Sequence, residues 1–130
     1  MARALPLLDE DRATERRAID FSNQEAVTCG LRDTVGTLRP RVADSPYGFA
    51  LVLGDDGVLL GRLRKAALGG DQEALAEEVM EPGPSTNRPD ASLAKLLAKL
   101  QERELTTAIL TDPEGRLLGV VRRADLEAVG

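Results

Sequence analysis

The 130-residue sequence contains no histidine, no tryptophan and a single cysteine, Cys29. Without histidine, the chain has no imidazole for catalysis, for metal binding or for a pH switch. One cysteine forms neither an internal disulfide nor a cysteine-only zinc site. The aromatic residues Phe21, Tyr47 and Phe49 are too few for a surface that stacks nucleic-acid bases.

Positive charge and long apolar runs are also scarce. The 17 Lys and Arg residues are outnumbered by 22 Asp and Glu residues, so the formal net charge is −5. An acidic chain is not drawn as a whole to nucleic acid. No apolar run approaches the ~20 residues of a membrane span, and the apolar N-terminal run is too short for a secretory signal. We therefore expect a cytoplasmic protein with neither nucleic acid nor a membrane as partner.

An internal repeat with an offset of 58 residues organises the chain. Residues 49–68 align without a gap with residues 107–126. Identical residues occupy eight of these 20 positions: Ala50/Ala108, Gly57/Gly115, Leu59/Leu117, Leu60/Leu118, Gly61/Gly119, Arg64/Arg122, Ala66/Ala124 and Leu68/Leu126.

The second copy has the clearer structural signals. Asp90 or Ser92 can cap a helix over residues 91–103, whose leucines recur at helical spacing. Lys95, Lys99 and Glu102 fall mostly outside this leucine stripe, and we expect them to be solvated. Residues 106–111 and 116–121 are typical of two strands, and the turn between them contains proline and glycine. Gly119 inside the second strand indicates a bulge or a close backbone approach. A short helix is expected over residues 123–129.

The first copy repeats this order with weaker signals. Gly36 and Pro40 interrupt the helix position at residues 33–43, so we expect a short or kinked helix there. Strands are expected at 49–53 and 58–63. Residues 64–68 are expected to form the start of a closing helix. Further helices are expected over residues 72–80, between the copies, and around residues 12–19.

Two segments of the second copy resemble the CBS domain family. The run Val79-Met80-Glu81-Pro82, followed by a short extended piece and Pro89-Asp90-Ala91-Ser92-Leu93, is similar to the entry of a CBS repeat. Residues 110–126 are similar to the hairpin and closing helix of that family. With its tandem counterpart, the resemblance covers residues 20–130.

The resemblance implies an α+β fold in which two β-α-β-β-α repeats pack around a pseudo-two-fold axis. It places an N-terminal segment at 1–20, the first repeat at 21–69, a linker helix at 70–84 and the second repeat at 85–130. It further implies a non-catalytic regulatory module and a homodimer that acts on an unidentified effector protein. No cofactor is required; an adenine nucleotide or S-adenosylmethionine is the expected regulatory ligand.

The nucleotide motif of the family is degenerate here. The family has glycine, then Ser or Thr three residues later, then an Asp that accepts hydrogen bonds from ribose. Asp125 retains the acidic position, whereas Ala67 replaces it in the first copy. Arg122 and Arg64 occupy the Ser/Thr positions. The resemblance therefore implies at most one competent cleft, on the Asp125 side, although Asp125 can also simply stabilise a helix start.

The basic residues near the two closing helices leave two interpretations open. Arg122, Arg64 and Lys65, with Arg62 and Arg123, can bind phosphate. Alternatively they are solvated, or they block the clefts of a structural dimerisation module that acts only through a protein partner. The resemblance places four polar residues on the adenine side of the cleft, where ordinary strand propensity also explains them: Thr86, Asn87, Thr106 and Thr107.

Overall fold

The structure of the chain is a computed structural model, and it describes residues 17–129. Residues 12–16 of the expected N-terminal helix lie outside this range. The helices and two sheets confirm the expected α+β class. With η for a 3₁₀ helix, the elements are η1 (Ala18–Phe21), β1 (Val27–Cys29), α2 (Val35–Ala43), β2 (Phe49–Leu53), η2 (Asp55–Gly57), β3 (Leu59–Arg64), η3 (Lys65–Gly69), α3 (Ala76–Val79), β4 (Glu81–Pro82), α4 (Leu93–Glu102), β5 (Thr107–Thr111), β6 (Leu117–Arg122) and α5 (Arg123–Val129).

The first sheet has the strand order β1-β2-β3-β4. β1 and β2 are parallel, whereas β2 pairs antiparallel with β3, and β3 pairs antiparallel with β4. β4 belongs to the segment that leads into the second repeat. This lead segment therefore supplies an edge strand to the sheet of the first repeat.

The second sheet repeats the arrangement around the antiparallel pair β5 and β6. Asn87 forms a parallel bridge to Leu110 of β5, and Asn23 forms an antiparallel bridge to Val120 of β6. Asn23 lies in the segment that leads into the first repeat. Each sheet is thus completed by the lead segment of the other repeat, which we define as residues 17–23 for the first repeat and 75–81 for the second.

The offset of 58 residues is also the symmetry of the fold. Val58 forms a bridge to Arg116, the residue that the offset of 58 makes equivalent to Val58. The pseudo-two-fold axis therefore passes between the two hairpins. Two further bridges are counterparts of each other: Arg17 with Ser92, and Leu75 with Thr34.

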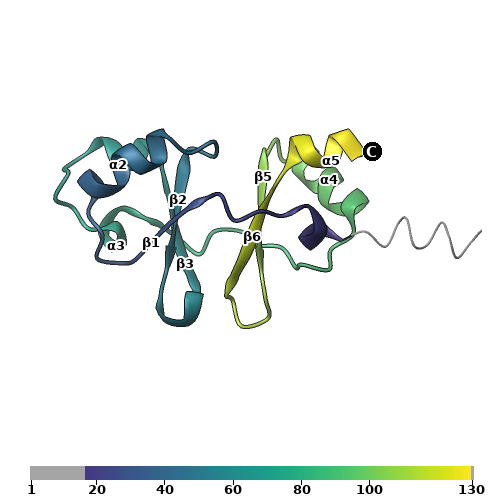
Figure 1. Cartoon of the computed structure of the whole chain (residues 1–130), viewed down its shortest axis with the longest axis horizontal. Helices are drawn as coiled ribbons and strands as arrows, with labels where there is room; N and C mark the ends of the chain where they lie inside the picture. The colour runs from purple at the N-terminus through teal and green to yellow at the C-terminus, as the bar shows by residue number, and fades with distance from the viewer. Residues whose placement is uncertain (1–16, 130) are drawn as a thin grey trace, which may run out of the picture.

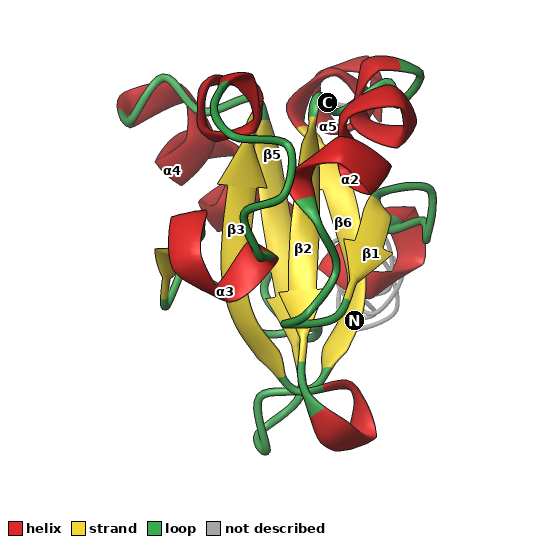
Figure 2. Cartoon of the chain, turned by 90° about the vertical axis from the view of Figure 1, so that its left-hand side faces the viewer, coloured by secondary structure: helices red, strands yellow, loops and turns green. Residues whose placement is uncertain are grey.

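The two sheets face each other, and helices cover their outer sides. In Figure 1, α2 and α3 lie beyond the first sheet while α4 and α5 lie beyond the second, and Figure 2 shows α2 and α3 in front of the first sheet. One apolar cluster lies between each sheet and the helices that cover it. The lead segments contribute to them reciprocally, because Ala18 is buried in the second cluster and its counterpart Ala76 in the first. A third cluster joins the sheets and contains Phe49, Leu51, Ile109 and Val120.

Gly61 and Gly119 allow the lead segments to approach the sheets closely. A Cβ on Gly119 would lie 3.0 Å from the Asn23 carbonyl oxygen and 3.1 Å from the Ser22 Cβ. A Cβ on Gly61 would collide with the Met80 side chain and lie 3.0 Å from the Glu81 carbonyl oxygen. The close approach expected at Gly119 is therefore confirmed, and the repeat uses it twice.

Three expectations for the second repeat agree with the structure. α4 begins after Ser92, whose Oγ accepts a hydrogen bond from the Lys95 N–H at 3.2 Å. Strands β5 and β6 and the final helix α5 also lie where the sequence places them.

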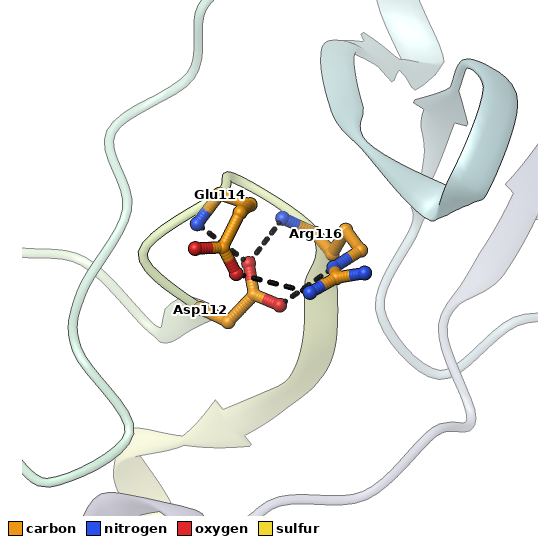
Figure 3. Close-up of polar contacts among 3 residues, drawn as sticks. All are labelled: Asp112, Glu114 and Arg116. Atoms are coloured by element: carbon orange, nitrogen blue, oxygen red, sulfur yellow. Dashed lines mark hydrogen bonds and ion pairs between the residues drawn. The ribbon is translucent and has the colours of Figure 1, made fainter.

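The hairpin turn of the second repeat is held by a polar cluster (Figure 3). Asp112 Oδ1 accepts hydrogen bonds from the N–H groups of Glu114 and Arg116 at 3.0 and 2.8 Å. Asp112 Oδ2 accepts another from Arg116 Nε at 2.8 Å. The backbone hydrogen bond from Arg116, together with its guanidinium, lowers the pKa of Asp112. Gly115 takes the positive φ, +87°, that this turn requires.

Two helices differ from expectation, the closing helix of the first repeat and the helix between the repeats. The closing helix is not an α-helix but the 3₁₀ helix η3, which ends before Gly70. The helix expected over residues 72–80 shrinks to the single turn α3, because Leu75 is extended and pairs with Thr34 instead. α2 keeps Pro40 inside it and is one residue shorter than α4.

Candidate functional site

Two pockets of unequal size lie between the repeats at positions related by the pseudo-two-fold axis. The larger cleft has a volume of about 440 Å³ and the smaller cleft about 200 Å³. Both are formed by residues of both repeats. The larger cleft is lined by Gly48, Phe49, Arg62, Arg64, Lys65, Ala66, Ser85, Asn87, Lys99, Leu100 and residues 104–109. The smaller cleft is lined by Pro46, Tyr47, Thr106, Thr107, Arg122, Arg123, Ala124 and Glu127.

The larger cleft gathers positive charge in an acidic protein. Arg62 and Arg64 project from β3, Lys65 opens η3, and Lys99 projects from α4. The Arg62 Cζ lies 5.8 Å from the centre of the Phe49 ring, so the guanidinium stacks on the aromatic floor of the cleft. The lining contains one carboxylate residue among those described, Glu104. This arrangement favours an anionic ligand.

The cations of the larger cleft are only partly neutralised. Glu81 Oε1 lies 3.0 Å from Arg64 Nε and 3.4 Å from Arg62 Nε. Burial by itself raises the pKa of Glu81, but hydrogen bonding and charge from the two arginines lower it on balance. Lys99 Nζ donates to Asn87 Oδ1 at 2.7 Å. Within the described part of the chain, neither lysine of the cleft pairs with a carboxylate.

Tyr47 occupies the smaller cleft. Its hydroxyl donates to Asn23 Oδ1 at 2.8 Å, and the Arg122 Cζ lies 5.9 Å from the centre of its ring. Burial raises the pKa of Tyr47, although the Arg122 charge opposes the shift. The counterpart of Tyr47 in the larger cleft is Leu105, which is 36% exposed. A bulky aromatic residue on one side and an exposed leucine on the other account for the difference in volume.

The arginines of the smaller cleft, Arg122 at the end of β6 and Arg123 at the start of α5, are paired with acids of α5. Arg122 Nε lies 3.3 Å from Asp125 Oδ2, and the Asp125 charge raises the pKa of Arg122. Arg123 Nε lies 3.6 Å from Glu127 Oε2. The smaller cleft therefore offers less room and less free positive charge than the larger one.

The structure distributes the residues expected at one site over separate places. Arg64, Lys65 and Asn87 line the larger cleft, and Arg122 lines the smaller one. Thr106 and Thr107 line both clefts. Asp125 belongs to neither lining and pairs with Arg122. Thr86 lies instead at an open outer pocket of about 580 Å³ that is also lined by Arg88, Asp90 and Asp112.

Three residues with clear roles in the clefts were not predicted from the sequence. Lys99 was expected on the solvated face of its helix, but it is half-buried and bonded to Asn87 in the larger cleft. Glu81 and Asn23 lie on the lead segments and bond to residues that line the clefts, Glu81 to Arg62 and Arg64 and Asn23 to Tyr47. They are counterparts under the offset of 58, which could have marked them as a functional pair.

The described residues contain no helix with the length and hydrophobicity of a membrane span. Nor do they contain a group of three or more acidic or cysteine side chains placed to hold a metal ion.

Known proteins give the fold a family. The CBS domain family model matches residues 76–128. A search of the curated proteins finds no match. The cytosolic domain of the Mg²⁺ channel MgtE in complex with ATP is similar, with a TM-score of 0.78 and 26% sequence identity over 92% of this chain. The chain therefore contains a CBS domain within residues 76–128. It spans 50% of the length of that MgtE domain.

Two further solved structures share the fold of this CBS-domain protein. The CBS domains of a transcriptional regulator from Streptococcus pneumoniae have a TM-score of 0.77 and 15% identity, over 87% of this chain and 98% of that one. CBSX2 in complex with AMP has a TM-score of 0.72 and 17% identity, over 86% and 93% of the two chains. The described chain therefore has the fold of a CBS pair, although the family model itself matches the second repeat.

Proposed function

We propose that this CBS-domain protein is a regulatory module that binds an adenosine phosphate in its larger cleft. The observation that carries the proposal is the concentration of Arg62, Arg64, Lys65 and Lys99 around one cavity between the repeats. The cavity volume of about 440 Å³ falls within the range of ligand pockets, roughly 300–1,000 Å³. The smaller cleft falls below that range.

The similar structures support the ligand class. One of them is a complex with ATP and another a complex with AMP. Both ligands carry phosphate, which guanidinium groups bind through charge-assisted hydrogen bonds. S-adenosylmethionine carries a positive sulfonium group, which four cations around the cleft disfavour. We therefore favour a nucleotide over S-adenosylmethionine.

The residue roles follow from the larger cleft. Arg64 and Lys65 bind phosphate, and Asn87, Thr106 and Thr107 lie on the side where the base enters. The counterpart of Asp125 here is Ala67, so this cleft lacks the ribose-binding carboxylate of the family motif. A ligand that used Asp125 would have to enter the smaller cleft, displace Tyr47 and separate Arg122 from Asp125.

Binding in this cleft couples the two repeats, because each contributes a wall. A ligand held between them favours the arrangement in which both walls contact it, and it shifts the population only by its differential affinity for the two states. CBS domains are regulatory, non-catalytic modules, and we propose that this chain likewise acts without catalysis. A cytoplasmic homodimer that passes the change to an effector protein completes the proposal.

Calorimetric titration of the full chain with AMP, ADP, ATP and S-adenosylmethionine tests this function. We expect at least one nucleotide to bind and Arg64→Gln to weaken its binding about tenfold or more, because one charge-assisted contact is lost. Arg122→Gln is the matched control at the equivalent position, and we expect less than about a twofold change. If none of the four ligands binds, the alternative of a structural dimerisation module with unoccupied clefts replaces the proposal.

A further inference from the structure

We propose that Glu81 is an internal competitor for the ligand phosphate and thereby determines how much negative charge a ligand needs to bind in the larger cleft. This inference rests on the proposed function, because it concerns the same cations. It assigns a role in ligand selection to a residue of the lead segment.

The position of the Glu81 carboxylate supports this role. Glu81 lies on β4 and is the direct partner of Arg62 on β3. A single oxygen, Oε1, accepts hydrogen bonds from Arg64 Nε at 3.0 Å and Arg62 Nε at 3.4 Å. Both arginines line the larger cleft. The carboxylate thus contacts the same guanidinium groups that a bound phosphate requires.

This interaction is also easily exchanged. The side chains of Glu81 and Arg64 are 52% and 56% exposed. Ion pairs in such an environment contribute little net stability, because water screens them and ordering two long side chains costs entropy. A phosphate group offers more charge and three acceptor oxygens. A phosphorylated ligand can therefore replace Glu81, whereas an uncharged ligand gains nothing from the exchange.

The symmetry of the fold supports the role as well. The counterpart of Glu81 is Asn23, which also lies on a lead segment and forms the equivalent bridge to the opposite sheet. Asn23 Oδ1 accepts the hydrogen bond that holds Tyr47 in the smaller cleft. The same position therefore serves both clefts, with a neutral amide where an aromatic ring fills the space and a carboxylate where cations surround it.

The consequence is selection by charge and a route to the linker. A nucleoside leaves the Glu81 pairs intact and binds without help from Arg62 and Arg64. A nucleoside triphosphate releases Glu81 and takes both guanidinium groups. Because Glu81 lies on the segment that joins the repeats, the release acts on that segment directly.

Glu81→Gln tests the inference, with Glu77→Gln as the matched control. Glu77 lies on the same lead segment, and none of the ion pairs of the described residues involves it, whereas Glu81 pairs with Arg62 and Arg64. Replacing either glutamate by glutamine changes the net charge equally. The full chain is titrated with ATP, adenosine and inorganic tripolyphosphate at constant salt. For Glu81→Gln we expect an affinity for ATP and tripolyphosphate about three- to tenfold higher, with adenosine changed less than about twofold. For Glu77→Gln we expect no change above about twofold with any probe.

The outcomes separate the inference from the proposed function. If the native chain binds ATP and Glu81→Gln binds it equally or more weakly, the competitor role of Glu81 is wrong while the cleft remains a nucleotide site. If the native chain binds neither ATP nor tripolyphosphate, both are wrong. Thermal unfolding of the two variants checks that each remains folded, because an exposed ion pair has little effect on the midpoint.

Discussion

The two clefts of this CBS-domain protein are built from equivalent segments and yet have opposite character. The larger is roomier and cationic, whereas Tyr47 lines the smaller and its arginines pair with acids of α5. The backbone frame is shared, since the bridges and close approaches recur at the offset of 58. A repeat can thus keep the backbone arrangement of two sites while substitutions at a few positions leave only one of them with room for a ligand.

Four pairs of counterparts carry most of the difference. Arg62 faces Phe49 in the larger cleft, where the smaller has Val120 and Thr107 at the equivalent positions. Leu105 leaves space that Tyr47 fills on the other side. The remaining pair is Glu81 and Asn23, which lie on the lead segments and bond to residues that line the clefts.

The interface that creates both clefts gives the largest expected effect. Leu51 and Ile109 are counterparts, are 0% and 2% exposed, and pack in the cluster between the sheets. We expect Leu51→Ala and Ile109→Ala each to lower the free energy of unfolding by about 2–5 kcal/mol, because each leaves a cavity. Urea denaturation measures both. A large loss from one variant alone would show that the interface is not shared equally by the repeats.

A smaller effect is expected where the lead segments cross the sheets. Gly61→Ala and Gly119→Ala introduce a Cβ against the opposite lead segment, so we expect each to destabilise the fold by about 1–3 kcal/mol. At both positions a carbonyl oxygen lies 3.0 Å from the new Cβ, that of Asn23 at Gly119 and that of Glu81 at Gly61. The side-chain neighbour differs, because it is the short Ser22 at Gly119 and the flexible Met80, which can partly move away, at Gly61. We therefore expect the Gly119 variant to lose more. Thermal or urea unfolding of both proteins would refute this if Gly61→Ala were the more damaging.

These equivalent positions show which parts of the fold could be predicted from the sequence alone. The offset of 58, the strands of both hairpins and α4 follow from local patterns of leucine, glycine and turn residues. The exchange of lead segments does not, because residues 17–23 and 75–81 meet partners distant in the sequence through backbone hydrogen bonds that leave no side-chain pattern. The same limit explains why Lys99 was placed on a solvated helix face: its position above Asn87 depends on how α4 packs.

The site residues could likewise be predicted only in part from the nucleotide motif. Identical arginines at 64 and 122 indicated a basic edge in both repeats, and the loss of the acid at Ala67 indicated that the clefts differ. The sequence did not show which cleft has room for a ligand. That depends on the ring of Tyr47, and its partner Asn23 comes from a segment that only the fold brings near.

A substitution of Tyr47 tests whether its ring blocks the smaller cleft. Tyr47→Ala removes the ring from the smaller cleft, so we expect ATP to bind with a stoichiometry of two instead of one. Adding Asp125→Ala should return it to one, because Asp125 is the carboxylate beside that cleft. Tyr47→Phe is the control: it keeps the ring and should keep one site, while the loss of the hydrogen bond to Asn23 costs about 1 kcal/mol. A stoichiometry of one for Tyr47→Ala would contradict the blocking role.

The smallest effect at neutral pH concerns Cys29, the buried counterpart of Asn87. Burial and, less strongly, the charge of Asp33 raise the pKa of Cys29 from 9.0 to about 11, against an opposing effect of Arg41. The folded state therefore holds the thiol proton more tightly than the unfolded state, so its contribution to stability is complete below pH 9 and is lost as the pH rises towards 11.

Two measurements check this behaviour. The native chain should react slowly with a thiol reagent at pH 7.5, and its decline in stability from pH 9 to 10.5 should be steeper than that of Cys29→Ala. Rapid labelling of the folded protein at neutral pH would contradict the burial of this thiol.

The larger cleft is the site at which we propose that the ligand binds. An NMR titration of the ¹⁵N-labelled full chain with ATP tests it most directly, because it locates binding residue by residue. We expect the amide signals of Lys65, Ala66 and Leu105 to shift with ATP concentration while those of Arg123 and Glu127 remain in place. Shifts centred on Arg123 and Glu127, or no shifts at either cleft, would contradict it.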